Sequence, residues 1–253
     1  MWPLRYNPAM ATQDLDQARV DLATSVRAAA RFGLSEGVCN HFSLAAPGRP
    51  GLFLINPQGL HWSEIRPSDI VTVDVKGRVV EGRHKVEPTA FYIHSRIHNS
   101  KRAPACVMHT HMPFTTALTL LEGGRLEPAS QNALRYYGRM AYDEEYNGLV
   151  LDDAEGDRIC AKLEGADVLF MANHGVMVTG PNVAWTFDDL YYLERAAMVQ
   201  VLAQGTGKLL KRVPHSVAAA TVKTMCEDRT QSDLHFAALK RLLDRDEPGW
   251  AQD

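Results

Sequence analysis

The stretch around which the chain is arranged is Ala105-Cys106-Val107-Met108-His109-Thr110-His111-Met112-Pro113. If it forms a strand, successive side chains point to opposite faces, so His109 and His111 emerge on the same face. Neutral imidazole is a common ligand of zinc, iron, manganese and cobalt, and a strand end is stiff enough to hold two rings in a chelating geometry. The pair therefore predicts a metal site that requires a third ligand from another segment.

The composition is that of a globular protein without a broad charged surface. The chain has 253 residues, 45% of them hydrophobic, and a formal net charge of −3. This balance offers no basic field for nucleic acid or for an anionic membrane, so we expect neither as a partner. No apolar run approaches the roughly 20 residues that cross a bilayer. Four scattered cysteines and an N-terminus without an apolar signal core indicate free thiols in a reducing cytoplasm.

The patterns along the chain predict one domain over residues 1–253, with a loose N-terminal arm at 1–11 and a helical tail at 206–253. Short strands and hairpins occupy the first third. Residues 128–148 are rich in tyrosine and arginine but weakly patterned, which leaves open a lid, a subunit contact or a pocket wall. From apolar residues at helical spacing, and from Gly and Pro near the ends, we expect helices near 14–32, 88–98, 114–121, 152–162 and 182–204.

Polar residues elsewhere in the chain are further candidates for the site. Asn40 and Ser43, where a turn runs into a strand, can offer hydrogen bonds to a ligand or can be ordinary turn residues. His94 and His98 are four residues apart and share a helix face. They are either packed, hydrogen-bonded histidines or part of an active site, and His94 is the better candidate for the second role.

The third histidine follows a predicted strand at 166–172, which runs directly into Asn173-His174-Gly175. If this strand neighbours the strand of His109 and His111 in one sheet, the three imidazoles can meet at one point. Three imidazoles that leave a coordination position open are typical of a catalytic rather than a structural metal site. Gly175 would allow a sharp backbone turn beside the ion.

Several short motifs, in this order and spacing, resemble the class II aldolase/adducin family over roughly residues 12–205. They are Cys39-Asn40-His41-Phe42-Ser43, Leu54-Ile55-Asn56-Pro57-Gln58-Gly59, Phe91-Tyr92-Ile93-His94-Ser95-Arg96-Ile97-His98, Val107-Met108-His109-Thr110-His111, and Asn173-His174-Gly175 with the later Leu193-Glu194-Arg195-Ala196-Ala197. The resemblance implies an α/β fold, a three-layer α/β/α sandwich about a central, mostly antiparallel sheet. It also implies a fourfold-symmetric homotetramer with the metal near a subunit boundary.

The resemblance implies that one divalent ion per chain, zinc or manganese, is bound by His109, His111 and His174. It points to Asn40, Ser43 and Gly59 as substrate-binding residues.

Two departures from the family pattern bear on the reaction. Aldolases of the family carry a glutamate before the metal dyad, as ligand and proton-transfer base, where this chain has Ala90. Only Glu87 nearby offers a carboxylate. The family also often has an arginine where Ala45 stands, so a phosphate-binding charge is missing. The run around His94 is closer to the adducin-like and decarboxylase-like branches, which lack that glutamate.

These features favour a metal-dependent carbon–carbon lyase, specifically a decarboxylase of a small keto, hydroxy or hydroxyaromatic acid that reacts through a metal-stabilised enolate. Loss of carbon dioxide needs no base to begin it, so it tolerates Ala90 better than aldol cleavage does. His94, Glu87 and Tyr137 are the candidate proton donors or orienting residues. The alternatives are an aldolase or epimerase acting on a sugar or sugar phosphate, and a non-catalytic adducin-like interaction module.

Overall fold

The computed structural model describes residues 14–252, so the arm expected at 1–11 lies outside the described residues. The helices are α1 (Leu15–Arg31), α2 (Pro88–His98), α3 (Pro113–Thr119), α4 (Gln131–Leu134), α5 (Asp153–Leu163), α6 (Val183–Gln204), α7 (His215–Glu227), α8 (Thr230–Asp246) and the 3-10 helix η2 (Pro67–Asp69). The strands are β1 (His41–Ala45), β2 (Leu52–Ile55), β3 (Val71–Asp74), β4 (Val79–Glu81), β5 (Cys106–Thr110), β6 (Met140–Asp143), β7 (Val168–Met171) and β8 (Gly175–Gly180).

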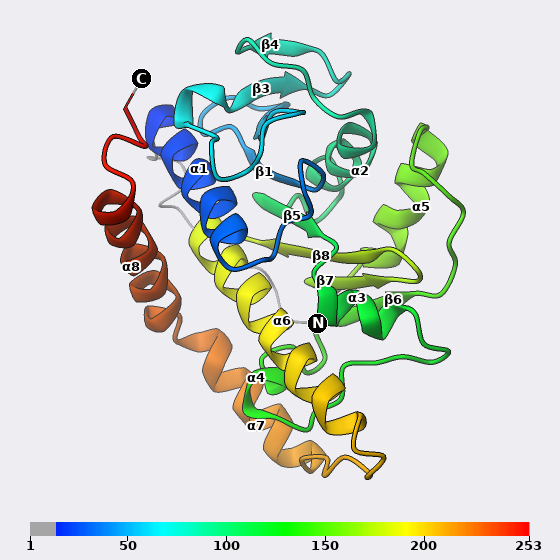
Figure 1. Cartoon of the computed structure of the whole chain (residues 1–253). Helices are drawn as coiled ribbons and strands as arrows, with labels where there is room; N and C mark the ends of the chain where they lie inside the picture. Colours follow the sequence, from blue (N-terminus) through cyan, green and yellow to red (C-terminus); the bar gives the residue numbers. More distant parts are fainter. Residues whose placement is uncertain (1–13, 253) are drawn as a thin grey trace.

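All eight strands form one sheet in the order β4-β3-β2-β1-β5-β8-β7-β6 (Figure 1). Every neighbouring pair is antiparallel except β6 and β7, which are parallel. The central strands β1 and β5 pair in a register that sets His41 opposite His109. Since residues directly opposite each other point to the same face of a sheet, these two imidazoles lie side by side.

Helices cover both faces of the sheet and make three layers (Figure 1). On one face, α1 and α6 pack over Phe42, Met108 and their neighbours, which belong to the larger apolar core, and α8 packs on α1 and α6. On the other face, α2 and α5 pack over a smaller core that contains Val107 and Met177. The period of two along β5 thus sends Met108 to the α6 side and both Val107 and His109 to the α2 side. The expected α/β/α sandwich with a mostly antiparallel sheet is confirmed.

The structure adds detail to one segment and corrects one expectation about local structure. The segment 128–148, which has little periodicity, contains α4 and the edge strand β6, because a four-residue edge strand needs no strong alternation when its residues are half-buried. The neighbour of β5 is β8, the strand after His174, and β7 lies one position further out. His174 therefore reaches the site from the turn between β7 and β8.

The C-terminal part of the chain is helical, with α8 packed against α6 and α1. Among the described residues, no helix combines the length and the apolar character that crossing a membrane requires. The prediction that 1–253 is a single domain stays a prediction.

Candidate metal centre

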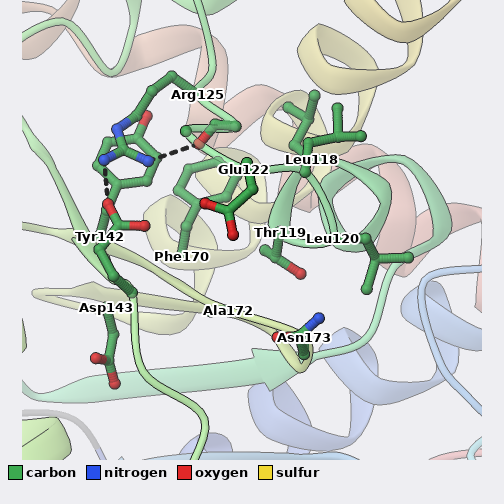
Figure 2. A pocket seen from close by; sticks show the side chains of 14 residues that line it. Leu118, Thr119, Leu120, Glu122, Arg125, Tyr142, Asp143, Phe170, Ala172 and Asn173 are labelled. Atoms are coloured by element: carbon green, nitrogen blue, oxygen red, sulfur yellow. Dashed lines mark hydrogen bonds and ion pairs between the residues drawn. The ribbon is translucent and has the colours of Figure 1, made fainter.

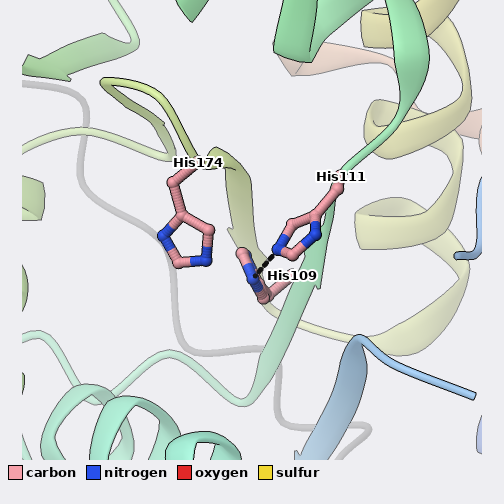
Figure 3. Close-up of side chains that lie close together, drawn as sticks. All are labelled: His109, His111 and His174. Atoms are coloured by element: carbon pink, nitrogen blue, oxygen red, sulfur yellow. Dashed lines mark hydrogen bonds between the residues drawn. The ribbon is translucent and has the colours of Figure 1, made fainter. Parts of the chain in front are cut away.

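Three histidines from two segments meet at the end of β5 (Figure 3). His109 is the penultimate residue of β5, His111 follows the strand, and His174 lies in the turn before β8. Their ring centroids are 4.8 to 5.0 Å apart, and one nitrogen from each ring lies within 4.8 Å of the others. Among the described residues, these three form a group that could hold one metal ion, as the sequence predicted.

The outer nitrogens of two rings are fixed by acceptors. His109 Nδ1 lies 3.0 Å from the Val176 carbonyl oxygen, and His111 Nδ1 lies 2.6 Å from Glu36 Oε2. Both Nδ1 atoms must carry a proton to donate, so in the neutral rings both Nε2 atoms present lone pairs. These Nε2 atoms are 3.1 Å apart. Two facing lone pairs at that distance repel unless a cation lies between or beside them, so the donor set fits a divalent metal.

The electrostatic environment keeps the His109 and His174 rings neutral and available as ligands. Burial and the neighbouring His111 lower the pKa of His174 to about 4. Burial, then His174 and His41, hold the pKa of His109 well below its usual value. A neutral imidazole has the lone pair that a metal requires, so neither ring has to lose a proton before it binds an ion at neutral pH.

Gly175 is required by space rather than by a special backbone angle. A Cβ there would lie 2.5 Å from the Thr110 carbonyl oxygen and 2.8 Å from His111 Cδ2. The expected sharp turn instead falls two residues earlier at Asn173, whose φ is +55°. The absence of a side chain at 175 lets the turn that carries His174 lie against His111.

The histidines open onto a cavity of about 880 Å³. Asn40, Gly59, Glu87 and Ala90 contribute to its wall, together with Tyr146. Asn40 is 5% exposed, has a φ of +75°, and neither polar atom of its side-chain amide has a hydrogen-bond partner. An unpaired buried amide costs free energy, which a polar ligand in the cavity would recover. Two of the three predicted substrate-binding residues, Asn40 and Gly59, therefore face the cavity.

Glu87 caps the N-terminus of α2 beside the cavity. Its Oε2 accepts hydrogen bonds from the Ala90 amide at 2.9 Å and from the Thr89 hydroxyl. The same oxygen lies 3.6 Å from His41 Nε2. Ala90 is buried in the cavity wall and brings no charge of its own. Glu87 thus places a carboxylate one helical turn before the position at which family aldolases carry theirs.

His41 is a cavity residue to which sequence reasoning assigned no role. It lies opposite His109 in the sheet, with ring centroids 5.0 Å apart, and it is 6% exposed. Burial, His111 and His174 lower its pKa to about 3. Its position in the motif of Asn40 and Ser43, two residues before Ser43 on the same face of β1, was the available signal.

Three predicted site residues lie off the cavity wall. Ser43 and His94 are buried behind His41, on β1 and α2, and hydrogen-bond to each other at 2.5 Å. Tyr137 is remote from the cavity lining within its own chain; its hydroxyl lies 2.6 Å from His215 Nδ1 on α7. Direct proton donation by His94 or Tyr137 stays a prediction. The tyrosine that does line the cavity is Tyr146, whose ring centroid is 6.3 Å from that of His174.

A smaller pocket of about 120 Å³ lies at the other side of Asn173, between the end of α3 and β6 (Figure 2). Most of its charged groups are already paired: Arg125 stacks on Tyr142 and contacts Glu144, and Asp143 pairs with Arg158. With these groups engaged and a much smaller volume, this pocket is a poorer site than the cavity at the histidines.

Comparisons with known proteins agree with this geometry. Residues 20–201 match the model of the family described as Class II Aldolase and Adducin N-terminal domain, and the chain belongs to that family. The crystal structure of an aldolase II superfamily protein from Pseudomonas syringae superposes with a TM-score of 0.86, at 32% identity over 93% of this chain and 95% of the other.

Two relatives with different names are also similar. The protein named Decarboxylase NovR from Streptomyces niveus is 29% identical over 87% of this chain and 83% of its own length. Human beta-adducin is 34% identical over 76% of this chain but only 28% of its own length. The family therefore includes relatives named for a lyase reaction and relatives named as adducins.

Proposed function

We propose that this protein is a divalent-metal-dependent carbon–carbon lyase, and specifically a decarboxylase of a small oxygenated acid. The observation that carries the proposal is the convergence of His109, His111 and His174 on a cavity whose wall has Ala90 in place of the aldolase glutamate. The similarity to the protein named Decarboxylase NovR supports the same reaction class.

His109, His111 and His174 would hold the ion. A divalent cation supplies a Lewis acid that stabilises negative charge developing on a substrate oxygen. Zinc or manganese suits a site of three imidazoles. Glu36, hydrogen-bonded to His111 Nδ1, orients that ring and raises its basicity, as carboxylates behind metal-bound histidines do.

The chain's own residues then bind and orient the acid. The free amide of Asn40 offers one donor and one acceptor to substrate oxygens inside the cavity. When the carbon–carbon bond breaks, carbon dioxide leaves and its bonding electron pair stays on the substrate. One proton must then be delivered to that carbon. Glu87 is the carboxyl group nearest to His41 at the cavity wall and is our candidate for this transfer.

Decarboxylation is favoured over aldol cleavage because the two reactions need different proton transfers. Aldol cleavage starts with removal of a hydroxyl proton by a base, whereas loss of carbon dioxide needs only a proton donor at the end. Ala90 provides no base at the position of the aldolase glutamate. The cavity wall therefore suits the second sequence of steps better.

The test combines metal analysis with product analysis. We expect the purified protein to bind about one zinc or manganese ion per chain, and His109→Ala or His174→Ala to abolish binding. His215→Ala, on the surface helix α7, is the matched control and should keep the ion. Incubation of the zinc-loaded protein with β-keto acids and hydroxyaromatic acids should release carbon dioxide. Release of an aldehyde from a sugar phosphate instead would contradict the proposal and identify an aldolase.

The similarity to beta-adducin favours one second candidate, an interaction module without chemistry. A wild-type chain that binds no divalent ion would support that module and contradict the lyase. We also propose, from the family resemblance, that the protein acts as a homotetramer on a small-molecule substrate in the cytoplasm. Sedimentation of the purified chain tests the tetramer.

A further inference from the structure

A chain of buried hydrogen bonds runs from the cavity into the layer between the sheet and α2. His41 Nδ1 lies 3.0 Å from His94 Nε2, and His94 Nδ1 lies 2.5 Å from Ser43 Oγ. Ser43 Oγ lies 2.7 Å from His98 Nε2. His98 Nδ1 ends the chain 3.0 Å from the carbonyl oxygen of Pro104. Three imidazoles and one hydroxyl are thus linked in series behind the cavity.

The far end of this chain decides the direction of every hydrogen bond in it. The Pro104 carbonyl can only accept, so His98 Nδ1 carries a proton and donates it. Burial lowers the pKa of His98 to about 4, so the ring is neutral at pH 7 and its Nε2 has a lone pair. That lone pair accepts the hydroxyl proton of Ser43.

The same reasoning continues toward the cavity. With its own proton given to His98, Ser43 Oγ can only accept from His94, so His94 carries its proton on Nδ1. Burial, then the neighbours His41 and His98, hold the pKa of His94 well below its usual value. Its Nε2 is therefore an acceptor, and the donor to it is His41 Nδ1. The one remaining nitrogen, His41 Nε2, is left with a lone pair.

That lone pair lies at the cavity wall, 3.6 Å from Glu87 Oε2. Glu87 Oε2 already accepts hydrogen bonds from the Ala90 amide and the Thr89 hydroxyl, so an O–H group in the cavity can donate its one hydrogen to His41 Nε2. We propose that His98, Ser43 and His94 are positioning residues that hold the proton of His41 on Nδ1, so that His41 Nε2 accepts a hydrogen bond from a hydroxyl group of the ligand. The hydroxyl assignment deepens the proposed function, and with it the substrate class becomes hydroxylated acids.

The test reads the protonated nitrogen directly, without turnover. In long-range ¹H–¹⁵N correlation spectra of the zinc-loaded full chain at pH 7, we expect His41 to show a protonated Nδ1 and an unprotonated Nε2. Ser43→Ala removes the link and should convert the His41 signals to a mixture of both tautomers. Ser25→Ala, which removes an equally buried hydroxyl bonded to the Leu22 carbonyl, is the control and should change nothing.

A second variant covers the case that Ser43→Ala does not fold. His98→Phe keeps an aromatic ring packed on Phe53, whose ring centroid lies 5.1 Å from that of His98. The variant removes both ring nitrogens, so His41 should again show a mixture of both tautomers. A proton on His41 Nε2 in the wild type, or an unchanged His41 tautomer in the folded variants, would overturn the proposed role of His98, Ser43 and His94. If Ser43 had only a structural role, Ser43→Ala would lower stability but leave the ¹⁵N chemical shifts of His41, two hydrogen bonds away, unchanged.

The ligand is probed with a matched pair of acids. Lactate should shift the His41 Nε2 signal of the zinc-loaded wild type, whereas propionate, which lacks the hydroxyl, should not. Equal effects of the two acids, or none, would overturn the hydroxyl assignment. These tests follow no reaction, so they can succeed or fail independently of carbon dioxide release. The His41 tautomer and the hydroxyl contact could therefore be confirmed even if the proposed lyase activity were contradicted.

Discussion

Gly175 illustrates how a missing side chain can position a metal ligand. The Thr110 carbonyl and the His111 ring occupy the space in which a Cβ would lie, so residue 175 must be glycine for the turn of His174 to come this close. Asn173 completes the arrangement by adopting a left-handed backbone, which asparagine tolerates better than most residues. The position of His174 in the candidate metal centre thus depends on the residue before it and the residue after it.

Gly175→Ala should weaken metal binding while leaving the fold intact. The added methyl group collides with backbone at Thr110 and with His111, so the histidines must separate. We expect zinc affinity to fall by about tenfold or more, the range found when groups supporting metal ligands are displaced. Competition with a chromophoric chelator measures it. Gly205→Ala is the control, since its Cβ comes no nearer than 3.4 Å to any neighbour. Undiminished affinity in Gly175→Ala would contradict this reading.

Glu36→Gln should also weaken metal binding, though less. The amide can still accept a hydrogen bond from His111 Nδ1, but it no longer increases the basicity of the ring as a carboxylate does. Because Glu36 is exposed, we expect a loss near the lower end of the usual range, about tenfold in zinc affinity. Glu164→Gln, an exposed carboxylate outside the cavity wall, should bind zinc as the wild type does. Equal affinity of both variants would remove Glu36 from the site.

At the scale of elements, α6 holds the segment that follows the metal ligands. Glu194 of α6 is buried and accepts hydrogen bonds from the amides of Phe114 and Thr115, at 2.8 and 2.9 Å. These amides are unpaired donors of the first turn of α3, which begins two residues after His111. The motif around Glu194 therefore acts as a cap from another helix.

Glu194→Gln should destabilise the protein by about 1 to 2 kcal/mol, the usual cost of losing a helix cap or a charged hydrogen bond. The amide has one accepting oxygen, so one backbone N–H keeps its acceptor and the other would face the NH2 group, which is itself a donor. The midpoint of urea denaturation measures the loss. Glu227→Gln, whose 3.9 Å pair with Lys223 is exposed, should change stability little. A Glu194 variant as stable as that control would contradict the capping role.

Elements whose apolar residues recur at helix or strand spacing could be predicted from the sequence. Features that depend on pairing between distant strands could not. Helix α6 and strand β5 follow from their spacing, and the alternation of β5 placed His109 correctly. Strand β6 was not predicted because Met140–Asp143, an edge strand of mostly half-buried residues, shows no alternation of apolar and polar side chains. Its extended conformation is fixed by pairing with β7, which lies later in the chain. The position of His41 beside His109 depends on the register of two strands far apart in the chain, which no local pattern encodes.

At the scale of the whole molecule, a buried charge network ties the layers together. Asp189 on α6 pairs with Arg139, Arg135 and Arg229, which come from the segment before β6 and from the start of α8. Burial acts to raise the pKa of Asp189, but the guanidinium groups of Arg139, Arg229 and Arg135 outweigh it and hold that pKa below its usual value. The folded state therefore binds the proton of Asp189 less readily than the unfolded chain.

Asp189→Asn should destabilise the protein by about 3 to 5 kcal/mol, because it removes a carboxylate shared by three guanidinium groups and leaves that of the buried Arg229 without a carboxylate partner among the described residues. In the wild type the stabilisation is fully present above the pKa of an unfolded aspartate, about 3.9, and is lost as the pH falls through the lower folded value. Denaturation followed from pH 7 to pH 3 should therefore show a steeper loss for the wild type than for the variant. Parallel curves would contradict this assignment.

The register between β1 and β5 determines both the position of His109 in the candidate metal centre and the position of His41 beside it. The same pairing that sets His109 toward the candidate metal centre sets His41 beside it, and a slip of β5 by one residue would turn His109 into the apolar layer beneath α6 and leave His41 without it. A chain with the wrong β1–β5 register would therefore lose metal binding and the position of His41 beside the metal centre together. Misfolded molecules would then be inert rather than partly active, and ion content would report the fraction of correctly folded chains.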